Sequence, residues 1–224
     1  ATLPMPSAVI LPSADPATAA PTAQMTMAPQ ALPHVEAYHA KNPDVVGYIA
    51  IKGTALHDPV LYTPGEDAYL YRNWEGDEDR AGSIYIDKHA ILQPRDTNLL
   101  LHGHNMRNGS RFHTLLSYQD AAFCKQHPII QFDTLYEAGR YEVVAAFRSQ
   151  VFRPEDDVFK FYQFYSAQNE QEFQNYLQNI QSLALYNTGV TATYGDQLLT
   201  LSTCEYSQPN GRMVVVAKRV EGGP

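Results

Sequence analysis

The stretch LLTLSTCEYSQPNGRMVVVAKRV, residues 198–220, decides how this chain is expected to fold. Residues 197–203 are rich in Leu and Thr and residues 213–220 in Val, which is typical of β-strands. The polar residues between them, with their Pro-Asn-Gly turn sequence, form a loop. We therefore expect two consecutive strands, with Cys204 and Arg212 at opposite ends of one loop.

Six further strands are expected upstream of this pair. Residues 98–102, NLLLH, are a continuous apolar run that fits a strand buried on both faces. The other five expected strands, which carry β-branched and aromatic residues, are 44–51, 56–62, 83–87, 129–135 and 141–151. The short connections suit an antiparallel barrel with helices at its rim, so the expected fold class is mainly β.

Helical patterns occupy the longer connections between the expected strands. The expected segments are 34–42, a helical turn at 66–72, 110–127 ahead of Pro128, and 155–185. The segment 155–185 is the longest of these. Its apolar stripe has the spacing of one helix face and indicates core packing rather than a cofactor site; the stripe is Phe173, Tyr176, Leu177 and Ile180.

The first 32 residues differ in composition from the rest of the chain. Residues 1–32 are dense in Ala, Pro, Ser and Thr, which predicts a linker or stalk, or else a tail without a role, ahead of one domain at 33–224. A hydrophobic fraction of 44% is enough for one core. No run approaches the roughly 18 apolar residues of a membrane span, so the chain is expected to be soluble or to have lost an anchor.

Charge limits the classes of partner. The formal net charge is -8, and the Lys and Arg residues are scattered along the chain. Binding to phosphates needs a clustered basic face. We therefore expect peptides or small molecules as partners and no nucleic acid.

Cys204 and His104 are the candidate nucleophile and base. A thiol reacts well when a neighbour raises its thiolate fraction, and His is the usual neighbour. Both residues follow strand ends, which can approach each other closely on one barrel rim. Arg212, on the returning strand, is placed to stabilise an oxyanion. The alternatives are an inert, half-buried Cys204 and a solvated Arg212.

The second cysteine, Cys124, is expected to be a packed helix thiol. A Cys124–Cys204 disulfide is the alternative. Two cysteines without metal-ligand spacing predict no metal site, and no cofactor is expected.

Several strings resemble one protein family, the sortases, and within it class B. Besides 198–220 they are LLLHGHNMRNGSRF at 99–112, NPDVVGYIAIKGT at 42–54, VLYTPGEDAYL at 60–70 and AGSIYID at 81–87. The resemblance extends over about residues 42–220. It implies an eight-stranded sortase-type β-barrel with an N-terminal helix and a long helix before the seventh strand.

The resemblance also implies a cysteine transpeptidase of the cysteine endopeptidase class. Cys204 then attacks the carbonyl of Thr in a C-terminal sorting signal, of NP type or LP type, and forms a thioacyl enzyme. His104 acts as acid for the leaving amine and as base for the incoming one, and Arg212 holds the oxyanion or the substrate backbone. An amine of a cell-wall precursor accepts the acyl group, which anchors a surface protein.

Further residues are implied as substrate-binding by the same resemblance. They are Ser202, Thr203, Glu205 and Leu70. One departure is His102, where many class B members have Tyr. It makes His102 a rival base, but His104 is favoured because it occupies the Gly-His-Asn position.

The resemblance places the protein at the extracellular face of the membrane of a Gram-positive bacterium, held by an N-terminal anchor. The alternatives are a pilin-polymerising sortase that uses a Lys amine, a non-catalytic barrel that binds peptides or wall fragments, and a Cys/His wall hydrolase. The sequence leaves the sorting signal, the acceptor amine and the oligomeric state open.

Overall fold

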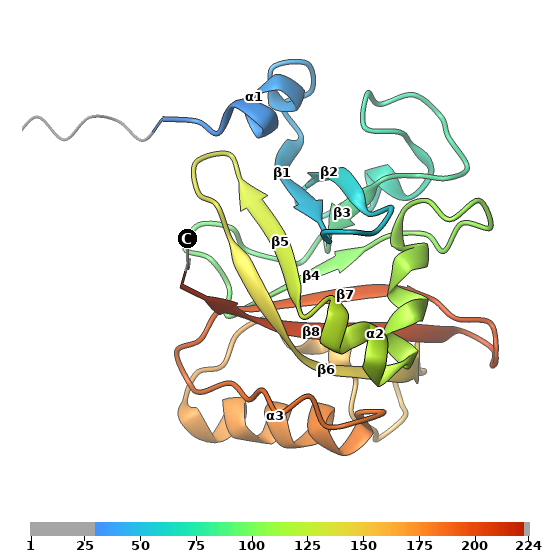
Figure 1. Cartoon of the computed structure of the whole chain (residues 1–224), viewed down its shortest axis with the longest axis vertical. Helices are drawn as coiled ribbons and strands as arrows, with labels where there is room; N and C mark the ends of the chain where they lie inside the picture. The colour runs from blue at the N-terminus through green and yellow to red at the C-terminus, as the bar shows by residue number, and fades with distance from the viewer. Residues whose placement is uncertain (1–29, 222–224) are drawn as a thin grey trace, which may run out of the picture.

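Eight strands close into a barrel, as the sequence predicts (Figure 1). The structure is a computed structural model and describes residues 30–221, so most of the predicted linker lies outside the described residues. The strands are β1 (Val45–Ala50), β2 (His57–Leu61), β3 (Ile84–Ile86), β4 (Asn98–His102), β5 (Ile129–Thr134), β6 (Arg140–Gln150), β7 (Leu198–Cys204) and β8 (Gly211–Val220).

The strands do not all run antiparallel, so that part of the prediction is wrong. Around the barrel the order is β1-β2-β3-β4-β7-β8-β6-β5, and both β2–β3 and β4–β7 are parallel pairs. Parallel neighbours need a long crossover connection, which the chain supplies with residues 62–83 and 103–197. The second crossover brings the C-terminal ends of β4 and β7 to the same rim.

The helical segments are more broken than predicted. α1 (Pro33–His39) and the 3-10 helix η1 (Ala68–Tyr71) lie where helical structure is expected. The predicted helix 110–127 is instead η2 (Phe112–Gln119) followed by α2 (Ala121–Gln126). The break occurs at Asp120, whose backbone is extended and whose carboxylate accepts the Ala122 N–H as an N-cap.

α3 (Glu170–Leu183) is the long helix before β7, but it begins later than predicted. Residues 155–169 are irregular apart from η3 (Phe161–Gln163). The Asn169 side chain accepts the Glu172 N–H at 3.0 Å, and this cap sets the start of the helix. Within residues 30–221, no helix has the length and apolarity needed to cross a membrane.

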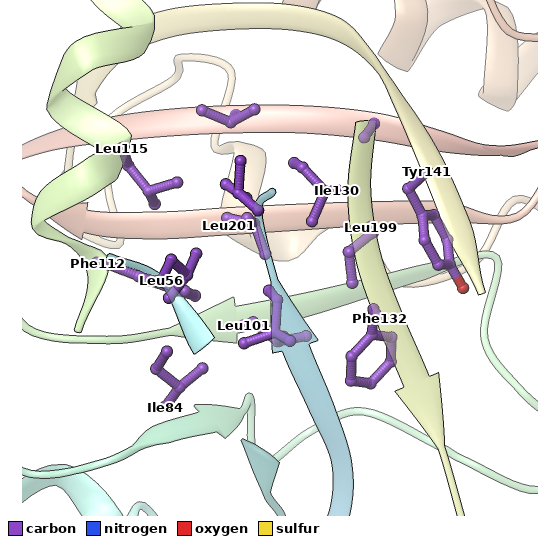
Figure 2. Close-up of a cluster of buried hydrophobic side chains, with 14 of the residues drawn as sticks. Leu56, Ile84, Leu101, Phe112, Leu115, Ile130, Phe132, Tyr141, Leu199 and Leu201 are labelled. Atoms are coloured by element: carbon purple, nitrogen blue, oxygen red, sulfur yellow. The ribbon is translucent and has the colours of Figure 1, made fainter. Parts of the chain in front are cut away.

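The two faces of β7 point into different surroundings. Leu199 and Leu201 point into the barrel and pack in its core with residues such as Leu101 (Figure 2). Leu198 packs on the outside with the stripe of α3, and this helix covers the outer face of β6 together with β7 and β8 (Figure 1). Because side chains alternate along a strand, the outer face of β7 continues to Cys204, its last residue.

Candidate active site

Cys204 and Arg212 are direct cross-strand partners at the barrel rim. The register pairs Cys204 of β7 with Arg212 of β8. Directly opposite residues of antiparallel strands have side chains on the same face, with Cβ atoms about 4.5–5.5 Å apart. Cys204 is a free, half-buried thiol. The predicted hairpin geometry, in which the two residues lie side by side, is confirmed.

The Arg212 guanidinium is held by backbone carbonyl oxygens. Its Nη1 donates to the carbonyl oxygens of Gly211 at 3.0 Å and Asn210 at 3.3 Å. No ion pair joins it to a carboxylate in the part of the chain that the structure describes. The register brings the Cβ atoms of Cys204 and Arg212 close together, so a guanidinium charge that can stabilise an anion is available at this rim.

Tyr85 lies on β3, beside the same rim. Burial raises the pKa of its phenol well above the usual range, and the negative charges of Asp67 and Asp87 raise this pKa further. The charge of Arg212 opposes the shift, whereas Cys204 adds to it. The phenol is therefore neutral at physiological pH and can donate or accept a hydrogen bond close to the thiol.

His104 follows β4 and faces residues of η1. Its Nε2 lies 2.8 Å from the carbonyl oxygen of Leu70, and its ring stacks on exposed Tyr71 at a centroid separation of 5.6 Å. A carbonyl oxygen can only accept, so Nε2 carries a proton in this arrangement. No hydrogen bond joins His104 to Cys204 among the described residues.

The rim segment that carries His104 is tied to β7. The Gly103 N–H donates to the Ser202 carbonyl at 3.3 Å, and the Thr203 hydroxyl donates to the Gly103 carbonyl at 2.7 Å. Gly is needed here, because a Cβ at position 103 would lie 2.8 Å from a carbon of the Phe112 ring. The parallel pairing of β4 and β7 thus continues past the end of β4.

The predicted substrate-binding residues occupy different positions around Cys204. Ser202 is 2% exposed, and its Oγ has no hydrogen-bond partner among the described residues. Thr203 is also buried, with its hydroxyl engaged by Gly103. Glu205 is half-buried and accepts from Ser207 in the β7–β8 loop. Leu70 contributes its carbonyl to the contact with His104.

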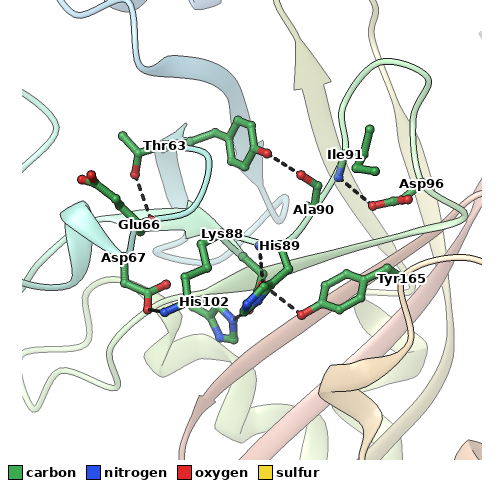
Figure 3. A network of polar contacts seen from close by, with 12 residues as sticks. Thr63, Glu66, Asp67, Lys88, His89, Ala90, Ile91, Asp96, His102 and Tyr165 are labelled. Atoms are coloured by element: carbon green, nitrogen blue, oxygen red, sulfur yellow. Dashed lines mark hydrogen bonds and ion pairs between the residues drawn. The ribbon is translucent and has the colours of Figure 1, made fainter.

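His102, the rival base, is bound by an acidic partner (Figure 3). Its Nε2 lies 2.8 Å from Asp87 Oδ2, and Tyr165 donates to Oδ1 of the same carboxylate at 2.9 Å. Burial opposes ionisation of Asp87, but hydrogen bonds from His102 and from the His89 backbone N–H hold its pKa well below the usual range. The Nε2 atom of His102 is therefore engaged by a carboxylate, whereas that of His104 faces a backbone carbonyl.

The surroundings of His104 are open. A depression of about 700 Å³ shares Leu70 and Tyr71 with the His104 contacts, and it is also lined by Asp67, Ala68, Arg72, Glu78, Asp79 and Arg80. The depression therefore adjoins the residues that His104 contacts, but neither His104 nor Cys204 is part of its lining. Within residues 30–221, no three His, Cys, Asp or Glu side chains converge to hold a metal ion.

Sequence reasoning missed three residues at the site: Tyr71, Tyr85 and Asn105. Asn105 donates from Nδ2 to the Cys204 carbonyl at 3.1 Å. Tyr71 and Asn105 are sequence neighbours of Leu70 and His104, which were singled out, so adjacency was an available signal. Tyr85 carried no such signal, because only the pairing of β3 with β4 brings it to the rim.

Comparison with known proteins gives a consistent match. A family model described as the sortase domain matches residues 49–220. The chain is 32% identical over 191 residues to sortase B of Staphylococcus aureus (strain NCTC 8325 / PS 47), covering 84% of this chain and 75% of the relative. It is 34% identical over 184 residues to sortase B of Listeria monocytogenes serovar 1/2a, covering 80% and 71%.

Solved structures agree with the sequence relatives. A Staphylococcus aureus sortase B–substrate complex superimposes with a TM-score of 0.76 at 32% identity, over 87% of this chain and 88% of that one. A Bacillus anthracis sortase B structure gives 0.73 at 33% identity, over 84% of each chain. With the barrel and the sequence match both in place, the chain belongs to the sortase family and, within it, to class B.

Proposed function

We propose that this sortase is a cysteine transpeptidase that cleaves a C-terminal sorting signal after Thr and transfers the acyl group to an amine of a cell-wall precursor. One observation carries the proposal: the free Cys204 thiol lies directly opposite Arg212, a guanidinium without an acidic partner among the described residues. A thiol beside an unpaired cation is what acyl transfer through a thioester needs.

Acylation uses all three proposed catalytic residues. The Cys204 thiolate attacks the Thr carbonyl carbon, and the carbonyl oxygen becomes an oxyanion that Arg212 stabilises. The C–N bond then breaks, and the leaving amine takes a proton from His104. The product of this half-reaction is a thioester between Cys204 and the Thr carbonyl.

Deacylation runs the same steps in reverse with a new amine. His104 takes a proton from the incoming amine as its nitrogen attacks the thioester carbonyl. Arg212 again stabilises the oxyanion, and the C–S bond breaks to return the Cys204 thiolate. One amide replaces another, so the reaction consumes no nucleotide.

Substrate binding is proposed for the residues around the thiol. The Ser202 hydroxyl, which has no partner in residues 30–221, and the Glu205 carboxylate lie on either side of Cys204 along the strand and loop. Leu70 lies at the open depression beside His104. Thr203 keeps its predicted role in the groove, although its hydroxyl is engaged by Gly103 in the chain alone.

The proposed setting is the outer face of a Gram-positive cell membrane, reached through an N-terminal anchor. The proposed partners are the sorting signals of surface proteins and the amine of a wall precursor. The support is family membership together with the substrate complex of the Staphylococcus aureus relative. NP-type and LP-type signals are both compatible with what is known of this chain.

The proposal is tested by mass spectrometry of the protein incubated with NPQTN-type or LPxTG-type peptides and an amine, either oligoglycine or a diaminopimelate-bearing compound. We expect cleavage after Thr, a thioacyl adduct on Cys204, and transfer to the amine. Cys204→Ala should abolish all three, whereas the matched variant Cys124→Ala should keep them.

Three results would contradict the proposal. Binding of the peptides without any adduct or product indicates a non-catalytic barrel. Rapid transfer to water, with no preference for amines, indicates a hydrolase. Transfer to a Lys side chain of a protein, but not to wall-type amines, indicates a pilin-polymerising enzyme.

A further inference from the structure

We propose that Asn105 is a positioning residue that fixes Cys204 relative to His104. This inference rests on the proposed function, because it assumes that these two side chains act together. Asn105 directly follows His104, and its side chain reaches across to the strand that carries the thiol.

Both ends of the Asn105 side chain are held. Nδ2 donates to the Cys204 carbonyl oxygen at 3.1 Å, and Oδ1 lies 2.7 Å from Nδ1 of His113. An amide oxygen accepts only, so His113 donates from Nδ1. The two partners together fix the orientation of the amide, with its nitrogen toward β7.

The same segment is closed by backbone contacts. Asn105 and Arg111 form an isolated antiparallel bridge, and the Phe112 N–H donates to the His104 carbonyl at 3.0 Å. Arg111 has a φ of 57°, which is strained for a residue with a side chain. Its guanidinium is anchored to Asp58 at 2.6 Å. Asn105 thus projects from a closed turn rather than from a free loop.

The Asn105 side chain contacts the cysteine residue directly, through the Cys204 carbonyl oxygen. His104 follows the end of β4 and Cys204 ends the neighbouring strand β7. No hydrogen bond joins the two residues in the described part of the chain, so their separation depends on how the two segments are joined. Gly103 is joined to Ser202 and Thr203, on the N-terminal side of His104. Asn105 provides the tie on the C-terminal side. In acyl transfer, a misplacement of about 1 Å can cost about 100-fold in rate.

Loss of this tie should therefore slow chemistry more than binding. We expect Asn105→Ala to lower kcat about tenfold, the effect of one hydrogen bond of roughly 1.4 kcal/mol, with little change in KM for the peptide. Asn105→Asp keeps the size and the acceptor for His113 but loses the donor to Cys204, so its loss should be at least as large. Asn108→Ala, in the same turn, is the matched control, because the Asn108 side chain contacts Ser110 instead.

His113 should act only through Asn105. We expect His113→Ala to lower kcat less than Asn105→Ala does, and the double variant to match Asn105→Ala, because the two residues form one chain of contacts. Additive losses would show that His113 has an independent role and would overturn this part of the proposal.

A measurement without peptide separates this inference from the proposed function. The rate of Cys204 alkylation by a neutral reagent, followed against pH, reports on the thiol and its neighbours whether or not the right peptide has been found. We expect Asn105→Ala and Asn105→Asp to change this pH profile and Asn108→Ala to leave it as in the parent. Identical profiles for Asn105→Ala and the parent overturn the inference. The inference is also overturned if the loss of turnover in Asn105→Ala disappears once turnover is corrected for the folded fraction, which thermal unfolding measures.

Discussion

The two cysteines of this chain occupy opposite kinds of environment. Cys124 lies in α2, is 5% exposed, and belongs to the interior cluster that includes Tyr118. Burial raises the pKa of its thiol, and the interaction with the Tyr186 hydroxyl only partly offsets this shift. Cys204 is half-buried at the end of a strand, opposite a guanidinium and beside the segment that carries His104.

The difference shows what makes a thiol a candidate nucleophile. Both side chains are free thiols. Cys124 is packed as a small apolar group, whereas Cys204 ends a strand opposite an arginine and is tied to the segment that carries His104. The proposed chemistry therefore depends on the rim formed by β4, β7 and β8, and not on the cysteine as a residue type.

The largest contrast is expected in thiol reactivity. In the native protein we expect iodoacetamide to modify Cys204 more than about 10³-fold faster than Cys124, because Cys124 becomes accessible only when the structure opens. Peptide mapping of the alkylated protein against time measures both rates. In denaturant the two rates should converge. Comparable rates in the native protein would show that the two environments do not differ in thiol reactivity.

Substitution of Arg212 is expected to have the next largest effect, on kcat. We expect Arg212→Ala to lower kcat for peptide transfer about 100-fold, because it removes the group proposed to stabilise the oxyanion. Arg212→Lys should recover little, since an ammonium does not reproduce the planar guanidinium. Arg219→Ala, on the same strand and paired with Glu137 and Gln197, is the control and should keep parent activity. Equal losses in Arg212→Ala and Arg219→Ala would contradict an oxyanion role.

Substitution of the buried cysteine, Cys124, is expected to change stability rather than activity. We expect Cys124→Ser to lower the free energy of unfolding by about 1–2 kcal/mol, because a hydroxyl is more costly to bury than a thiol. Urea unfolding measures this change. Turnover per folded molecule should stay at the parent value. A stability loss of the same size in Cys204→Ser would mean that the two sites are not distinct.

Much of the fold could be predicted because its signals are local. Each strand core was anticipated from composition, and β4 was predicted with its observed bounds, because NLLLH is apolar throughout and a turn follows it. The helices were harder. The pattern across 110–127 and 155–185 does not reveal the caps at Asp120 and Asn169, which decide where α2 and α3 begin.

The candidate site could be predicted only in part. Cys204 and Arg212 share a hairpin, so their proximity follows from sequence position. The place of His104 depends on the parallel pairing of β4 with β7, which joins segments about 100 residues apart and leaves no local pattern. The contacts of Tyr85 and Asn105 depend on that pairing, so they could not be predicted before the pairing itself was known.

The smallest expected effect is on the pH dependence of the free energy of unfolding, to which the buried Cys124 thiol contributes. Burial raises the pKa of the Cys124 thiol in the folded protein, so the folded state holds this proton more tightly than the unfolded chain does. The resulting stability is fully present below the unfolded pKa of about 8.5 and is lost as pH rises through the higher folded value. We therefore expect the free energy of unfolding, from urea titrations between about pH 7 and about pH 9.5, to fall more steeply for the parent than for Cys124→Ala. Parallel falls would mean that the Cys124 thiol loses its proton as readily inside the barrel as in water.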